Sequence, residues 1–300
     1  MITIPIQVSG DVWNNRVQVE ELIRALEPGT QIMLDLCSEG PSLQYLGIVE
    51  LFQQHNFDVS VTRWSNIVES VPFAKHLCSK QSHFYPMSRH YWTEEIVNNA
   101  NAEFKFGLFV GRSTLERDRI LYDAVHRWPS KFLLSKMPNK HNKAKSWTDS
   151  IPSLQGYTIQ DQYQIPELST GKMMSSLICD YYQRFNLEIV CETYTLGDTF
   201  FPTEKTVRPM VGNKPFIVYG PRNFLKNLQQ QENFQTFGSL WDEGYDQLEG
   251  LPRWNAICQL IDWLSGLREA QWAKIIQQAS AITNHNRTIL KNIINDRKKL

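Results

Sequence analysis

The chain has 300 residues, of which 42% are hydrophobic and 21% are charged. This composition fits one large globular domain or two of ordinary size, and it excludes disordered and collagen-like chains. Lys plus Arg and Asp plus Glu each number 31, so no net charge favours nucleic acid or an anionic membrane as a general partner.

The beginning of the chain predicts strands that alternate with helices. Short β-rich runs are separated by segments whose apolar residues recur at helical spacing. Strands separated by helices of this length indicate βαβ units and a parallel sheet. The expected strands are residues 2–8, 31–36 and 57–62, and the expected helices are residues 17–26 and 42–55.

The same alternation returns further along the chain. The expected strands are residues 104–110, 131–135, 187–193 and 214–218, with a short extended piece from Thr236. The expected helices are residues 114–126, 169–185, 203–211, 222–231 and most of 252–300. The polar stretch 138–167 is expected to be a long loop. The sequence therefore predicts an α/β protein with parallel sheets and a helical C-terminal tail.

Several common signals are missing from the sequence. No apolar run approaches the roughly 20 residues of a membrane span, and no signal peptide is visible, so we expect a cytoplasmic protein without a membrane span. There is no GxGxxG, P-loop or GxSxG motif and no Asp-x-Asp after an apolar strand, so we expect neither a cofactor nor a metal. The cysteines are widely spaced without CxxC pairs, which favours buried free thiols over disulfides or zinc. They are Cys37, Cys78, Cys179, Cys191 and Cys258.

The most informative pattern lies where a strand ends near Glu192 and a short helix then opens with Thr203-Glu204-Lys205. The free N–H groups and the positive dipole end of a helix start suit a phosphate. Glu204 can accept hydrogen bonds from ribose hydroxyls, and Lys205 can neutralise a pyrophosphate. Arg208 lies one turn further on, at a spacing expected to place it on the same face. The alternative is an ordinary solvated helix start, because Glu is favoured in any first turn.

The segment FFPTEKTVRPMVGNKPFIVYG, residues 200–220, resembles the donor-binding segment of the alpha-1,3-fucosyltransferase family. In that family a Thr-Glu-Lys begins a helix, and a strand with a small apolar run and a Gly follows. The segment is also similar to glycosyltransferase-like proteins of phages and marine microbes, which add a downstream FxTFxxxxDExYD pattern. That pattern occurs here at residues 234–246, and the resemblance covers at most residues 104–246.

The resemblance implies a metal-independent glycosyltransferase with two Rossmann-like lobes of the GT-B type. Residues 1–95 would form the acceptor lobe, residues 96–250 the nucleotide-sugar-binding lobe, and residues 251–300 helices that pack back on the lobes. Glu204 would bind the ribose and Lys205 the phosphates. The donor-binding candidates are Arg112, Arg117, Glu192, Thr203, Glu204, Lys205 and Arg208.

The two arginines of this set follow the strand that ends at Val110. A guanidinium at the carboxyl end of a sheet stands where open α/β folds bind ligands. In the resembled family an Arg after the corresponding strand meets the pyrophosphate, and Arg112 is the better match, with Arg117 second. The alternative is a surface Arg that pairs with Glu116 or Asp118.

An inverting transfer needs a base for the acceptor hydroxyl. The N-terminal half offers Asp35 at the end of a strand, Glu39 just after it, and His83. No motif supports any of the three, and a structural role is the alternative for each. An acidic cluster at residues 242–246 offers contacts to sugar hydroxyls, with loop capping as its alternative.

One basic run, residues 131–145, offers contacts to an acceptor. Its lysines suit a phosphate-bearing acceptor such as DNA, although lysines in a polar loop are commonly just solvated. The acceptor-binding candidates are Lys140, Lys143 and Lys145.

The sequence thus predicts an enzyme that moves a sugar from a nucleotide-sugar, used as a co-substrate, to an acceptor hydroxyl. The acceptor is a glycan or, as a variant, a hydroxylated DNA base. The first alternative is a phage- or defence-type protein that binds a nucleotide or sugar phosphate without turnover. A further one is a nucleic-acid-processing or defence protein that holds a signalling nucleotide.

Overall fold

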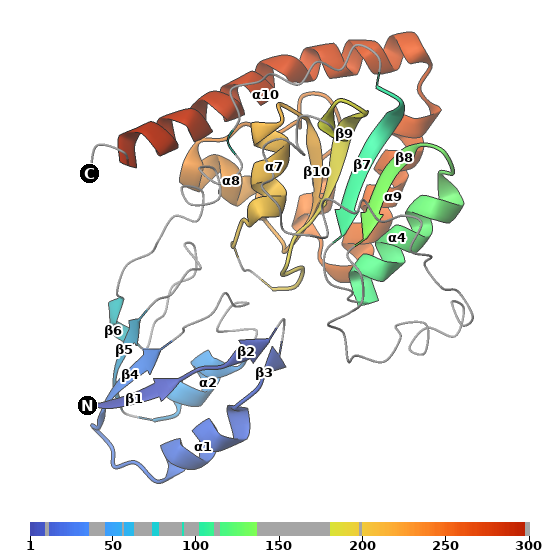
Figure 1. Cartoon of the computed structure of the whole chain (residues 1–300). Helices are drawn as coiled ribbons and strands as arrows, with labels where there is room; N and C mark the ends of the chain where they lie inside the picture. The colour runs from blue at the N-terminus through green and yellow to red at the C-terminus, as the bar shows by residue number, and fades with distance from the viewer. Residues whose placement is uncertain are drawn as a thin grey trace.

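The protein is described by a computed structural model. It covers residues 1–9, 12–35, 46–55, 57–62, 74–77, 92, 102–110, 115–136, 181–197 and 200–297. Within these ranges the chain is an α/β fold with two four-stranded sheets, and every strand pair in both sheets is parallel (Figure 1). This confirms the predicted fold class at the level of α/β with parallel sheets.

The first sheet has the strand order β1-β4-β5-β6, which follows the order of the chain. Its strands are β1 (Ile2–Pro5), β4 (Gln31–Asp35), β5 (Asp58–Thr62) and β6 (Ala74–Leu77). Helices α1 (Arg16–Arg24) and α2 (Ile48–Gln53) accompany it, and a small antiparallel pair joins β2 (Val8–Ser9) to β3 (Val12–Trp13). Buried residues between Ile4 and Val61 form the hydrophobic core of this part.

The first predicted strand, residues 2–8, is wrong at its end, because β1 stops at Pro5. The side chain of Asn15 explains the break. Its Oδ1 accepts the Gln7 N–H at 2.9 Å, and its Nδ2 donates to the Pro5 carbonyl at 2.7 Å. Since a side chain takes these backbone groups, the chain leaves the ladder and turns into the β2–β3 pair.

The second sheet has the order β10-β9-β7-β8, so the chain moves to one side and then reverses. Its strands are β7 (Phe104–Val110), β8 (Phe132–Lys136), β9 (Phe185–Cys191) and β10 (Phe216–Tyr219). The helices between them are α4 (Leu115–Arg127) and α7 (Glu204–Val211). Strand β9 is buried along its whole length, as expected for a parallel strand covered on both faces.

Helices α9 (Gly250–Gly266) and α10 (Glu269–Arg297) follow α8 (Phe224–Glu232) and the short helix η5 (Gly244–Gln247). Helix α9 lies beside α4, where Trp254 Nε1 donates to Asp123 at 2.6 Å. Helix α10 contacts α7 and begins near the amino end of β9, where Trp272 Nε1 donates to Asn186 at 2.8 Å (Figure 1). Helix α4 connects β7 to β8 in one direction along the sheet, and α7 connects β9 to β10 in the opposite direction. Because such crossovers are right-handed, the two helices cover opposite faces of the sheet.

Two further expectations are corrected. Residues from Thr236 do not form a strand, because Asn286 of α10 binds both backbone groups of Gln235, at 2.8 and 2.9 Å, in place of a ladder. Residues 169–180 of the expected helix 169–185 lie outside the described residues, and Phe185 at its expected end instead begins β9. The long loop at 138–167 lies outside the described residues. Of the helices that the structure describes, none has the length and hydropathy needed to cross a bilayer.

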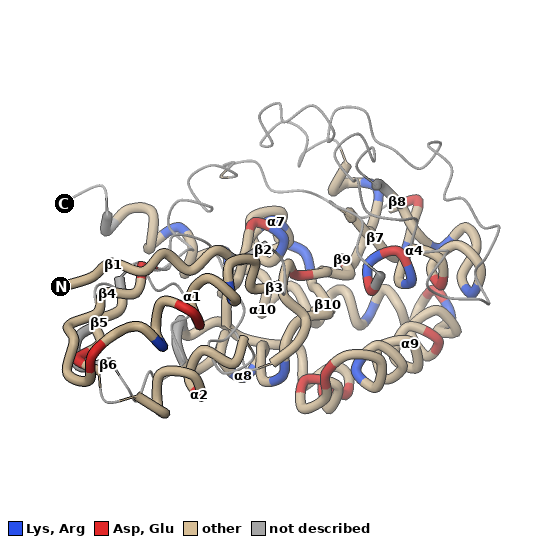
Figure 2. Tube along the Cα trace, turned by 90° about the horizontal axis from the view of Figure 1, so that it is seen from below, with Lys and Arg blue, Asp and Glu red and all other residues tan. Residues whose placement is uncertain are grey.

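Charged residues of both signs are interspersed over the described chain. Figure 2 shows Lys and Arg next to Asp and Glu at α4, α7 and α9. On these three helices, charges of both signs therefore lie close together.

Candidate functional site

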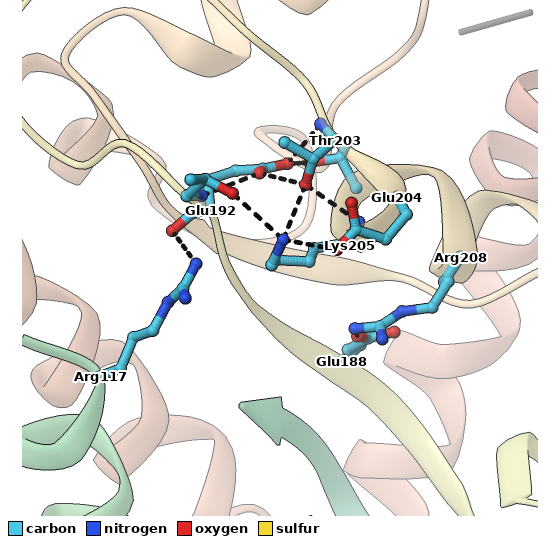
Figure 3. Close-up of polar contacts among 9 residues, drawn as sticks. Arg117, Glu188, Glu192, Thr203, Glu204, Lys205 and Arg208 are labelled. Carbon is cyan, nitrogen blue, oxygen red and sulfur yellow. Dashed lines mark hydrogen bonds and ion pairs between the residues drawn. The ribbon is translucent and has the colours of Figure 1, made fainter. Parts of the chain in front are cut away.

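The reversal of strand order in the second sheet falls between β7 and β9. In open α/β sheets, ligands bind outside the carboxyl ends of the two strands at such a reversal. Glu192 directly follows β9, Arg117 lies at the start of α4 after β7, and α7 begins at Glu204. Figure 3 shows that the structure brings these residues, with Thr203 and Lys205, to one place.

The Glu192 carboxylate fixes the amino end of α7 to the end of β9. Its Oε1 accepts the Thr203 N–H at 3.1 Å and the Thr206 hydroxyl at 2.5 Å. Its Oε2 accepts the Thr203 hydroxyl at 2.6 Å and the Thr193 N–H at 3.2 Å. A carboxylate has about four acceptor positions, and all of them serve the protein here. Glu192 is buried, and its geometry is that of an anchor for the loop and helix.

Thr203 caps α7 as the sequence predicts. It precedes the helix in an extended conformation, and its Oγ1 accepts the Lys205 N–H at 3.3 Å. Such a cap satisfies one of the four free N–H groups of a helix start. The helix therefore begins at a defined residue beside the reversal of strand order.

Lys205 lies in the first turn of α7. Its Nζ donates to Glu204 Oε1 at 2.6 Å and to the hydroxyls of Thr193 and Thr203, both at 3.2 Å. Burial alone would raise the pKa of Glu204, but the Lys205 ammonium outweighs it with help from Arg208, so the pKa of Glu204 is lowered. An ammonium has three N–H donors, so a phosphate would reach Lys205 by exchange with one of these oxygens.

Arg208 lies toward the sheet and away from the partners of Lys205 (Figure 3). It donates to Glu188 Oε1 at 3.1 Å and lies over the Phe109 ring, 5.5 Å from its centroid. Both charged side chains of this pair are buried. A buried carboxylate requires a partner charge. Arg208 therefore points toward Glu188, in the middle of β9, and pairs with it.

Sequence reasoning missed Glu188 and two residues near it. Tyr182 donates to Glu188 Oε2 at 2.5 Å, and burial raises the pKa of Glu188 to about 7 although Arg208 lowers it. Lys214 is fully buried, donates to the Phe185 carbonyl at 2.8 Å, and has a pKa that burial lowers to about 6. A charged residue inside the apolar run LEIVC is the signal that could have indicated this network.

Arg117 ties α4 to the same place. Its guanidinium donates to the Glu192 carbonyl at 3.0 Å, and only 5% of the residue is exposed. Asp35 ends β4 in the first sheet, in register with Pro5 and Thr62 of the neighbouring strands. The remaining candidates lie outside the described residues: Glu39, His83, Arg112, Lys140, Lys143 and Lys145.

The acidic cluster at residues 242–246 serves largely to fold the chain. Glu243 accepts the Phe237 N–H at 2.9 Å. Asp246 accepts the N–H groups of Leu225 and Lys226 at the start of α8 and pairs with the buried Arg253 at 2.9 Å. Loop and helix capping, the alternative considered for this cluster, therefore describes these two carboxylates.

In the part of the chain that the structure describes, no group of three or more His, Cys, Asp or Glu side chains is arranged to hold a metal ion. Cys191 and Cys258 are buried free thiols, and burial raises the pKa of each to about 12. No protein-family model matches the chain, and no curated protein matches it in sequence. The resemblance to fucosyltransferases therefore stays a prediction from the sequence.

Proposed function

We propose that the protein is a nucleotide-sugar-dependent glycosyltransferase that holds the donor diphosphate at the amino end of α7. The observation that supports this most is the position of Lys205, beside a capped helix start at the reversal of strand order. The buried anchor Glu192 keeps that helix start in place. The proposal includes a two-lobed, GT-B-like arrangement in which residues 1–95 carry the acceptor.

In the proposed reaction the acceptor oxygen attacks the anomeric carbon, and the bond from that carbon to the diphosphate oxygen breaks. Lys205 stabilises the negative charge that develops on the leaving diphosphate, without a metal or other cofactor. As a phosphate oxygen replaces Glu204 on the ammonium, the Glu204 carboxylate becomes free to accept ribose hydroxyls. The proton of the acceptor goes to a base, for which Asp35, Glu39 and His83 remain the candidates.

The acceptor is proposed to be a glycan, with a hydroxylated DNA base as the variant. DNA binding depends on several cationic contacts to phosphates. In the described chain, Lys and Arg are interspersed with acidic residues (Figure 2), which favours the glycan. The DNA variant would depend on Lys140, Lys143 and Lys145.

A second candidate is a protein that binds a nucleotide or sugar phosphate without turnover. One observation favours it: the carboxylates described around α7 are all engaged within the protein. Glu188 binds Arg208, Glu192 binds the two threonines, and Glu204 binds Lys205. None of these three is placed to take a proton from an acceptor.

The first test is a thermal-shift panel of UDP-, GDP-, ADP-, CMP- and dTDP-sugars. Ligand at about 100 times its dissociation constant should stabilise the native protein by about 2.7 kcal/mol. Lys205→Ala should abolish the shift, while Lys274→Ala, an exposed lysine on α10, should retain it. If no nucleotide shifts the native protein, or if both variants keep the shift, the proposed site is wrong. Release of nucleoside diphosphate in the presence of glycans then separates transfer from binding alone.

A further inference from the structure

A cavity of about 400 Å³ lies between α9 and the loop before η5. From α9 it is lined by Ala256, Gln259, Leu260 and Trp263, which recur at helical spacing along one side of the helix. Trp241 and Asp242 line it from the loop. Pockets for small ligands are mostly apolar with a few placed polar groups, and this size lies within their usual range.

Trp263 gives the cavity an accessible aromatic surface. The residue is 47% exposed, whereas Trp254 and Trp272 in the neighbouring core are 2% and 4% exposed. Exposing about half of an indole forgoes the hydrophobic stabilisation that burial would bring. The neighbouring residue Asp262 instead accepts hydrogen bonds from Arg127 and Trp128, which fixes this turn of α9 with Trp263 at the cavity.

Two polar side chains, of Asp242 and Gln259, also line this cavity. Asp242 Oδ1 accepts the Gly244 N–H at 2.8 Å, which holds the carboxylate in position. Gln259 is exposed, and its amide has no hydrogen-bond partner among the described residues.

We propose that this cavity binds a pyranose sugar unit. A pyranose ring has an apolar C–H face and a rim of hydroxyls, so its face can lie on Trp263 while its hydroxyls bind Asp242 and Gln259. A purely apolar ligand would cover the exposed Asp242 carboxylate and leave it only the Gly244 N–H as a partner, which is unfavourable. The site uses none of the residues around α7, so it is independent of the nucleotide site proposed above.

The test is saturation-transfer NMR and calorimetry with glucose, galactose, mannose, fucose and N-acetylglucosamine and their disaccharides. At least one saccharide should bind the native protein, and Trp263→Ala should weaken it by about tenfold or more, as for a central aromatic contact. Asp242→Ala should weaken it as well. Leu251→Ala is the matched control, because Leu251 is 46% exposed on the same helix and does not line the cavity. It should bind like the native protein.

Lys205→Ala separates this proposal from the proposed function, because it should leave saccharide binding unchanged while it removes nucleotide binding. The proposal is overturned if no saccharide binds the native protein, or if Trp263→Ala binds as well as Leu251→Ala. Loss of saccharide binding in Lys205→Ala would also overturn it, since the sugar would then sit at α7. Circular dichroism of each variant tests whether it is folded. If Trp263→Ala does not fold, Asp242→Ala serves as the second probe.

Discussion

Replacement of Glu192 by Gln tests whether this carboxylate holds the candidate site together. Each of its oxygens accepts two hydrogen bonds, from Thr203 and Thr206 at Oε1 and from Thr193 and Thr203 at Oε2. A Gln side chain keeps one acceptor oxygen but presents an NH₂ group at the other position. The two donors that contact this oxygen in the native protein would then face the NH₂ group, which is itself a donor.

The size of the effect follows from these contacts. Hydrogen bonds to a charged group contribute about 1.5–3 kcal/mol each, so losing two costs about 3–6 kcal/mol. A threonine hydroxyl can rotate toward another acceptor and recover part of this loss. We therefore expect Glu192→Gln to lower the free energy of unfolding by about 3 kcal/mol, measured by urea titration and circular dichroism.

The matched control is Glu249→Gln. Glu249 is exposed and accepts one hydrogen bond, from the Gly197 N–H at 3.2 Å. Its substitution should change the free energy of unfolding by less than about 0.5 kcal/mol. Equal stability of the two variants would refute the anchoring role of Glu192. A stable Glu192→Gln that has lost nucleotide binding would instead make Glu192 a ligand contact.

Three further predictions concern the interior of the second sheet. Burial raises the pKa of Glu188 from 4.5 to about 7, so between these values the folded protein binds more protons than the unfolded chain. Stability to urea should therefore fall as the pH rises from 4.5 to about 7, and Glu188→Gln should remove this fall. A native stability profile that is flat over this pH range would contradict the prediction. Burial lowers the pKa of Lys214 from 10.5 to about 6, so between these values the unfolded chain binds more protons than the folded protein and stability rises with pH. Lys214→Met should remove this rise. Gly107→Ala should destabilise the protein by about 1–3 kcal/mol, because a Cβ there would lie 2.8 Å from the Phe185 ring. Gly266→Ala, with nothing within 4 Å, is its control, and equal melting temperatures for the two would argue against this close approach.

Features that depend on neighbouring residues were predictable from the sequence. Strand β7 begins at Phe104 and ends at Val110, as the apolar run indicates. The helix start at Thr203 was predictable for the same reason, since a cap is formed by residues within one turn. The parallel arrangement of both sheets follows from alternating strands and helices.

Features that depend on distant pairs were not predictable. Helical spacing places Arg208 near Lys205, but the partner that directs its side chain is Glu188, on another element and 20 residues earlier in the chain. The same limit applies to Asp246. In the sequence it belongs to an acidic cluster that suggests a ligand site, but in the fold it pairs with the buried Arg253. In each case a buried charge required compensation, and only the fold identifies the partner.

Two kinds of polar contact meet at the amino end of α7, and they differ in how readily a ligand can replace them. The contacts of Glu192 and the Arg208–Glu188 pair are buried, so breaking them would leave uncompensated charge inside the protein. The Glu204–Lys205 pair is more accessible, with 31% of the Glu204 side chain exposed, and partly exposed ion pairs contribute little to stability. An anionic ligand can therefore take the place of Glu204 while the buried contacts keep α7 and β9 in position. This combination of a fixed helix start and one exchangeable carboxylate is what the proposed diphosphate site requires.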